Sequence, residues 1–197
     1  MLTTIPTSGR FLLRLSIAVL VSGLPAAAAA PPSVTIARDG HGLTATLANG
    51  GTASIALNYS PGTNNVCADQ HYAPCFEFHA EDGAMDVPIS VTAGCTLIHP
   101  GAVDCPALGV TSVTIVVKNG GSVMTTCDSG ICAGGQCFSG TTIHVEAGPD
   151  AVFSVKSDDG CVEDVVCAAG SGTVEADRMD RVGGCAYVER RRPLPRL

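Results

Sequence analysis

Large aromatic side chains and positive charges are scarce in this sequence. It contains no tryptophan, aromatic residues make up 4% of the chain, and 11 lysines and arginines face 18 aspartates and glutamates. Residues 31–189 hold only 5 of those basic residues. A body this acidic lacks the basic face that nucleic-acid binding requires, so we expect no nucleic-acid partner. With few aromatic side chains, the core must be thin and built from small branched residues.

Recognisable catalytic motifs are also missing. The chain contains neither Gly-x-Ser-x-Gly nor His-Glu-x-x-His, and its five histidines are scattered. A catalytic histidine needs a nucleophile and an orienting carboxylate within reach, which no motif supplies here. We therefore expect a protein that is not an enzyme. His71 and His79, which flank Cys75, are expected as isolated surface histidines rather than as ligands of one metal ion.

After the first thirty residues the chain has no long hydrophobic run. Arg10 and Arg14 precede an apolar stretch at 15–24, and proline and small residues follow it at 25–30. This order is typical of a secretory signal peptide, and the apolar stretch is shorter than the roughly 20 residues that span a bilayer. We expect residues 1–29 to be a cleaved signal peptide. The protein is then secreted and extracellular, with no membrane span.

Short apolar or alternating runs, each beside turn-forming residues, fill the rest of the chain. The sequence holds 23 glycines and 12 prolines, and no stretch after the signal peptide keeps helical periodicity over three turns. These features predict an all-β fold. Strands are expected at residues 33–37, 43–47, 53–59, 76–79, 87–92, 113–117, 141–145 and 151–155.

The ten cysteines all follow the signal peptide. An even number of cysteines in an exported chain predicts a disulfide framework of up to five bridges. A zinc site is the competing interpretation for Cys127, Cys132 and Cys137, but their spacing is loose for zinc ligands. The predicted disulfide cysteines are Cys67, Cys75, Cys95, Cys105, Cys127, Cys132, Cys137, Cys161, Cys167 and Cys185.

Some disulfide pairs follow from spacing. Cys95 and Cys105 bracket residues 96–104, with His-Pro-Gly at their centre, which predicts a hairpin closed by its own bridge. Two further pairs of near neighbours are expected, Cys67 with Cys75 and Cys167 with Cys185. The other four cysteines allow three pairings, and the sequence does not choose among them.

Four segments carry a resemblance to a known family. Cys105–Ile115 is similar to the start of a repeat region, Pro61–Val66 and Ala93–Cys95 to the β part that precedes it, and Cys167–Val182 to a closing repeat. Together they resemble exported bacterial proteins with haemolysin-type (RTX) calcium-binding repeats. The closing repeat, with Cys185 beyond it, also implies the pairing of Cys167 with Cys185.

The resemblance implies a parallel β-roll built from nine-residue repeats of the form Gly-Gly-x-Gly-x-Asp-x-U-x, where U is apolar and points inward. The match is degenerate. Asp150 and Asp164 keep the acidic position of the repeat, whereas Gly172 and Ser122 replace it. We therefore expect a short degenerate β-roll in which disulfides have taken over part of the stabilising role of the metal.

Calcium is the cofactor that the resemblance implies, bound weakly by carboxylate oxygens. Acidic turn residues are also commonly just solvated, which is the simpler interpretation. The ligands expected are Asp150, Asp158, Asp159, Asp164 and Asp177.

The expected organisation is thus a signal peptide, a hairpin- or sandwich-like N-terminal β region at 31–105, a disulfide-stapled β-roll at 106–189, and a basic disordered tail at 190–197. The expected function is that of a secreted, non-enzymatic structural or binding protein with a weak calcium site. The alternative is a disulfide-rich extracellular module that binds a protein or a glycan through its loops without metal. The arginines of the tail suit an anionic cell-wall or extracellular polymer, although such runs usually serve solubility.

Overall fold

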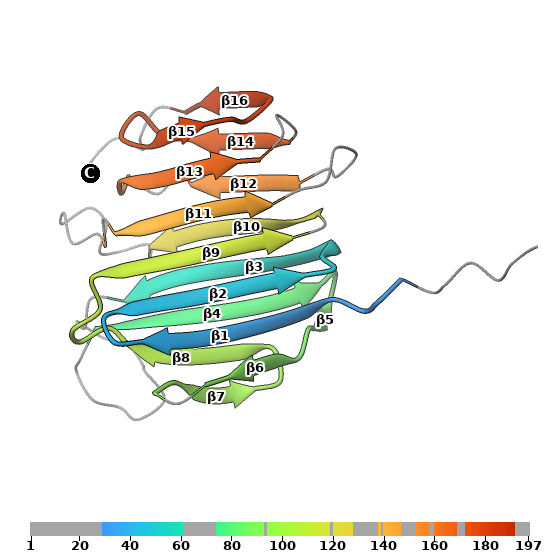
Figure 1. Cartoon of the computed structure of the whole chain (residues 1–197), viewed down its shortest axis with the longest axis vertical. Coiled ribbons are helices and arrows are strands. Elements are labelled where there is room, and N and C mark those ends of the chain that lie inside the picture. Colours follow the sequence, from blue (N-terminus) through green and yellow to red (C-terminus); the bar gives the residue numbers. More distant parts are fainter. Residues whose placement is uncertain are drawn as a thin grey trace, which may run out of the picture.

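The computed structural model describes residues 29–60, 74–92, 94–118, 120–127, 138, 140–146, 153–157, 160–168 and 172–191. These residues form β-strands and no helix, as the predicted all-β class requires, and thus include no helix able to cross a membrane (Figure 1). The strands are β1 (Ser33–Asp39), β2 (Gly42–Ala48), β3 (Gly51–Ser60), β4 (Cys75–Asp82), β5 (Met85–Asp86), β6 (Ile89–Val91), β7 (Thr96–His99), β8 (Ala102–Pro106), β9 (Ser112–Lys118), β10 (Gly120–Cys127), β11 (Thr141–Glu146), β12 (Phe153–Ser157), β13 (Glu163–Cys167), β14 (Thr173–Ala176), β15 (Arg181–Gly183) and β16 (Tyr187–Arg190).

The strands form two mixed sheets that lie one behind the other (Figure 1). Sheet A has seven strands in the order β15-β13-β11-β9-β2-β1-β6. Sheet B has nine strands: eight in the order β16-β14-β12-β10-β3-β4-β8-β7, with β5 paired to β4. One end of the stack therefore holds β6 and β7, and the other end holds β15 and β16, the last two strands of the chain.

Antiparallel pairing is confined to the N-terminal part of the chain. Strand β1 pairs antiparallel with β2, and β3, β4, β8 and β7 form an antiparallel ribbon in sheet B. Short turns connect β1 to β2 and β7 to β8, because antiparallel neighbours need only a tight connection, whereas the 14 residues 61–74 separate β3 from β4. The expected hairpin between Cys95 and Cys105 is present as β7 and β8, joined by Pro100 and Gly101.

From β9 onward the chain alternates between the two sheets. Strands β9, β11, β13 and β15 extend sheet A, each parallel to the one before, and β10, β12, β14 and β16 extend sheet B in the same way. The first pair continues an earlier one, since β9 lies parallel to β2 and β10 lies parallel to β3. The parallel part is thus built directly on the antiparallel part, and the two share both sheets.

Inward-facing side chains form continuous cross-strand rows. Alternation along each strand sends every second residue to the space between the sheets, and register aligns these residues from strand to strand. All members but the last of each row are buried. In sheet A the row is Ile36, Ala45, Ile115, Ile143, Val165 and Val182, and in sheet B it is Ala80, Ile55, Val123, Val155, Val174 and Val188.

Glycine is required where successive corners of the chain stack. Asn49 takes a left-handed conformation, with φ of 54°, at the corner between β2 and β3. A Cβ atom on the next residue, Gly50, would lie 2.4 Å from the carbonyl oxygen of Gly120, at the corner between β9 and β10. The two corners therefore lie directly against each other, which fixes where the parallel strands begin to stack on the N-terminal part.

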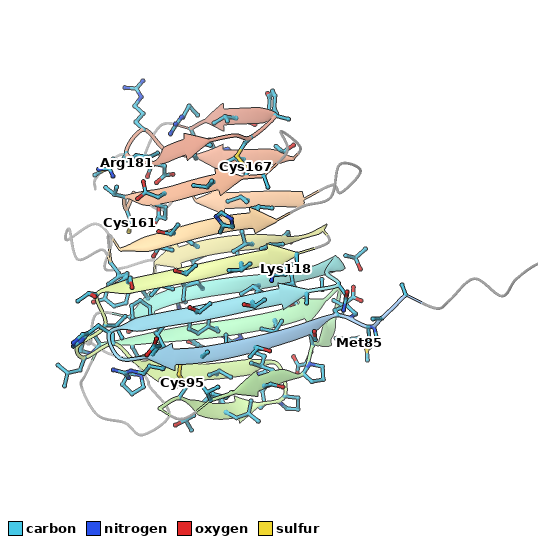
Figure 2. The ribbon with its side chains drawn as sticks, in the orientation of Figure 1. Met85, Cys95, Lys118, Cys161, Cys167 and Arg181 are labelled. Atoms are coloured by element: carbon cyan, nitrogen blue, oxygen red, sulfur yellow. A yellow bond between two sulfur atoms is a disulfide. The ribbon has the colours of Figure 1, made fainter. Side chains whose placement is uncertain are left out.

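Disulfides are placed near both ends of the stack. The Sγ atoms of Cys95 and Cys105 are 2.02 Å apart, and those of Cys167 and Cys185 are 1.94 Å apart, which confirms two of the three expected pairings. Figure 2 shows Cys95 near the end that holds β7 and Cys167 toward the end that holds β16. Cys75 and Cys161 are disulfide-bonded as well. The expected partner of Cys75, Cys67, lies outside the described residues, as do Cys132 and Cys137, on which the choice among the three open pairings depends.

The predicted tail begins too early at Arg190. This residue is the last of β16, and the next, Arg191, donates its backbone N–H to the carbonyl oxygen of Ala176 and pairs with Glu175 at 2.9 Å. The sequence predicted a solvated tail here because the groups that bind Arg191 belong to β14, a strand earlier in the chain, and cannot be inferred from the run of arginines itself. Residues 192–197 lie outside the described part.

Shortening one member of the inner row should destabilise the protein strongly. We expect Ile115→Ala to lower the free energy of unfolding by about 2–5 kcal/mol, because the cavity lies between strands packed on both sides. Val188→Ala, at the exposed end of the other row, should cost less than about 1 kcal/mol. Urea denaturation of the oxidised protein measures both changes, and equal effects would mean that Ile115 is not packed in a continuous core.

Candidate functional site

Two buried aspartates organise the turn between β14 and β15. The carboxylate of Asp177 accepts the backbone N–H of Gly160 at 2.8 Å on one oxygen and that of Met179 at 2.6 Å on the other. Asp180 accepts the backbone N–H of Glu163 at 3.1 Å and that of Asp177 at 3.0 Å, again on separate oxygens. Gly160 and Glu163 each lie 17 residues before the aspartate that binds them, so the two carboxylates tie one turn of the chain to the next.

An arginine from the last strand completes this turn. Nη1 of Arg190 donates to the carbonyl oxygens of Asp177 and Asp180, at 2.5 and 2.9 Å. The guanidinium thereby satisfies the backbone carbonyl acceptors of both aspartates. Asp177 and Asp180 both belong to an acidic stretch of the sequence, but only Asp177 was among the expected ligands. Arg190 was expected in the tail, because only the fold brings the three residues together.

Asp164 occupies a different position from Asp177. It lies on β13 directly opposite Arg181 of β15, and the two side chains form an exposed ion pair with 3.6 Å between nitrogen and oxygen. Figure 2 shows Arg181 at the edge of the stack. Within the described part of the chain, no three histidine, cysteine, aspartate or glutamate side chains converge as ligands for a metal ion. Asp150, Asp158 and Asp159 lie outside the described residues.

A cluster of three aromatic rings lies between the sheets. Tyr59, Phe76 and Phe138 have ring centroids 4.8 to 5.7 Å apart and line a small pocket together with Thr141 and the buried Glu163. Burial raises the pKa of Tyr59 above its usual value of 10.0, because the phenolate would lose hydration there. The cluster contains three of the chain's eight aromatic residues. Because large aromatic side chains contribute much of the apolar area of a core, we assign this cluster mainly a packing role.

A second polar group lies on sheet B, near the opposite end of the stack. His79 of β4 is hydrogen-bonded through Nε2 to Glu77, and His99 of β7 is hydrogen-bonded through Nδ1 to Asp86 of β5 at 3.2 Å. The two imidazole rings are 6.3 Å apart between centroids and are half-exposed. From their positions in the sequence, the histidines were expected to be scattered over the fold. The hairpin prediction placed His99 beside its turn, but nothing in the sequence indicated that β4 would pair with that hairpin.

Comparisons with known proteins assign no family to this chain. No protein-family model matches the sequence, no curated protein matches it, and no solved structure matches the fold. The function must therefore be inferred from the chemistry of the residues described above.

Replacing Asp180 should weaken the joint between successive turns of the chain. We expect Asp180→Asn to lower the free energy of unfolding by about 1–3 kcal/mol, because an amide offers one acceptor oxygen where two backbone N–H groups need acceptors. The matched control, Asp39→Asn at an exposed position, should change stability by less than about 0.5 kcal/mol. Chemical denaturation measures both. An unchanged stability for Asp180→Asn would show that the carboxylate does not hold the turn.

The partly buried Tyr59 should ionise at a higher pH than a solvent-exposed tyrosine. The chain has three tyrosines and no tryptophan, so absorbance at 295 nm follows phenolate formation with little background. Because the pKa of Tyr59 is raised, its unfolded form ionises first, and its contribution to stability is present below about pH 10 and is lost as the pH rises further. Tyr59→Phe should remove the highest-pH step of the titration. Loss of a step at the usual pH instead would contradict the burial of Tyr59.

Proposed function

We propose that the protein is a secreted, non-enzymatic structural or binding module. In this proposal β9–β16 are a short degenerate β-roll whose described turns are held by carboxylate hydrogen bonds and disulfides instead of calcium. The backbone would then follow the path of the haemolysin-type repeats, but the described turns would bind no calcium ion.

The path of the chain supports a β-roll. Strands alternate between two sheets and add in parallel, which is how a roll grows. The bonds from Asp177 to Gly160 and from Asp180 to Glu163 span 17 residues each, close to twice the nine-residue period of the repeat. Earlier turns are longer: paired residues of β9 and β11 lie 28 positions apart, and those of β11 and β13 lie 22 apart. The mixed character of both sheets comes from their N-terminal strands, which in this proposal form a cap on which the roll is built.

The observation that carries the proposal is the bonding of Asp177. In a calcium-binding turn the aspartate oxygens coordinate the ion, which takes six to eight oxygen ligands. Here both oxygens of Asp177 accept backbone N–H groups, one from its own turn and one from the turn before. The carboxylate therefore bridges successive turns directly, which is the structural task that a shared calcium ion would perform.

Disulfides support both the secreted location and the metal-free roll. The pairs Cys95–Cys105 and Cys167–Cys185 fit an oxidising, extracellular environment. The second pair joins the end of β13 to the segment between β15 and β16, so it fastens the last turn of the proposed roll. A loss of metal ligands near this end would then be compensated by a covalent bond.

The proposal predicts that thermal stability depends on the disulfide and not on calcium. The oxidised protein without residues 1–29 should melt at the same temperature in millimolar Ca²⁺ and in excess EDTA. The double variant Cys167→Ser/Cys185→Ser should melt roughly 5–15 °C lower, since one disulfide contributes about 2–4 kcal/mol and each kcal/mol shifts the melting temperature of a domain of this size by a few degrees.

Far-ultraviolet circular dichroism, which reports β-strand content, measures these melting transitions. Calorimetric titration with Ca²⁺ measures binding directly. A melting temperature that rises with Ca²⁺, or a fold that survives loss of the disulfide but melts in EDTA, would overturn the metal-free roll. Heat released on Ca²⁺ addition with the same rise would restore the original calcium expectation.

A further inference from the structure

We propose that His79 and His99 form a binding site for a divalent transition-metal ion of the class that prefers imidazole, with Zn²⁺ as the representative ion. The site would take one nitrogen from each ring and complete its coordination with water. It lies on the antiparallel part of sheet B and does not involve the proposed calcium-type turns, so it is independent of the proposed function.

Strand register brings the two histidines together. His79 of β4 is the cross-strand partner of Ala102 of β8, and Ala102 is in turn the partner of His99 of β7. The two imidazoles therefore flank one small residue in a single row across three strands. Directly opposite residues in antiparallel strands project from the same face of the sheet, which accounts for the approach of the rings to 6.3 Å.

Each ring has one nitrogen fixed by a carboxylate. Glu77 binds Nε2 of His79, and Asp86 binds Nδ1 of His99. An ionised carboxylate only accepts hydrogen bonds, so these nitrogens carry the hydrogen in the neutral ring. The lone pairs are then on Nδ1 of His79 and Nε2 of His99. A carboxylate behind the second nitrogen is the usual arrangement at histidines that bind metal ions, because it fixes the tautomer and raises ligand basicity.

The separation of the rings suits a shared ion. A metal bound to two imidazole nitrogens at 2.0–2.1 Å holds the ring centroids roughly 4.5 to 6.4 Å apart, from a right-angle to a linear arrangement. The observed 6.3 Å lies at the wide end of this range. A tetrahedral ion needs an approach of about 1 Å, for which there is room on the solvent side, because 44% of His79 and 46% of His99 is exposed.

The surrounding charge favours a cation. Glu77 lies directly opposite Asp104 of β8, in the row next to the histidines. Strands β4, β5 and β8 carry acidic residues, and neither these strands nor β7 carry a lysine or an arginine. The field at the two rings is therefore set by carboxylates that attract a divalent ion and favour its bound state.

The backbone around the site is held in place. The disulfide between Cys95 and Cys105 closes the hairpin that carries His99. At the hairpin turn, a Cβ atom on Gly101 would lie 2.7 Å from Cβ and Oδ1 of Asp86, so glycine at this position leaves the room that Asp86 occupies. The carbonyl oxygen of Gly101 also accepts the N–H of Ala80 at 2.9 Å, next to His79. The two histidines and their carboxylates thus belong to one small, braced unit.

Titration with Zn²⁺ tests the site. Calorimetry on the oxidised full-length mature chain should give one Zn²⁺ site that is weakened by His79→Gln and by His99→Gln by more than the roughly 10- to 100-fold typical of losing a carboxylate partner. The control is His144→Gln, on β11 of the other sheet, which should bind Zn²⁺ like the parent chain. Equal affinity in all four proteins would overturn the proposal, as would a loss in only one of the two histidine variants.

Imidazole ¹⁵N chemical shifts separate ligation from a merely structural effect. Without metal, His79 should carry its proton on Nε2 and His99 on Nδ1, and Zn²⁺ should shift the other nitrogen of each ring. Glu77→Ala should weaken Zn²⁺ by roughly 10- to 100-fold and change the tautomer of His79 without altering the melting temperature of the metal-free protein. Shifts confined to His144, or the opposite tautomers, would contradict the site as drawn.

Discussion

The packing of small branched side chains between the two sheets is the interaction on which the rest of this structure depends. Each side chain of an inner row is buried only when the neighbouring strands are present on both sides. The row in sheet A is an example: Ile36, Ala45, Ile115, Ile143 and Val165. A single turn of β9–β16 cannot close such a core by itself, which is a general property of stacked repeats. The corner contact between Gly50 and Gly120 starts the stack on the antiparallel N-terminal part, and every later turn is built on the one before.

The weakest place in such a stack is its last turn, where the rows end at Val182 and at the partly exposed Val188. Three sets of hydrogen bonds or covalent bonds hold this last turn. Asp177 and Asp180 bind the preceding turn, Arg190 binds the carbonyl groups of those aspartates, and Cys185 is joined to Cys167. Gly184, whose Cβ would lie 2.2 Å from the carbonyl oxygen of Cys167, allows the chain to pass close to this bridge. Where apolar burial fades, directional bonds take over the task of fixing the end of the chain.

Strands β5, β10 and β13–β16 were not among those expected from the sequence, but strands with clear local alternation were predictable. Residues 113–117 and 141–145, for example, alternate inward and outward as their sequences indicate. The hairpin of Thr96–Asp104 was readable as well, from its Pro-Gly turn and flanking cysteines. The acidic turn and the histidine pair were not, since Asp180 acts on a residue 17 positions earlier and His99 meets a histidine from another strand. Such contacts depend on which strands become neighbours, and alternation within one strand carries no information on that choice.

The central claim is that β9–β16 share one core with the N-terminal strands and that this core forms without calcium. Hydrogen exchange of the oxidised protein in EDTA tests this most directly, because it reads each strand separately. The account predicts that backbone amides in β11 and β13 exchange about as slowly as those in β2, with faster exchange only in β15 and β16. Rapid exchange throughout β11–β16 in EDTA, with protection returning when Ca²⁺ is added, would contradict it.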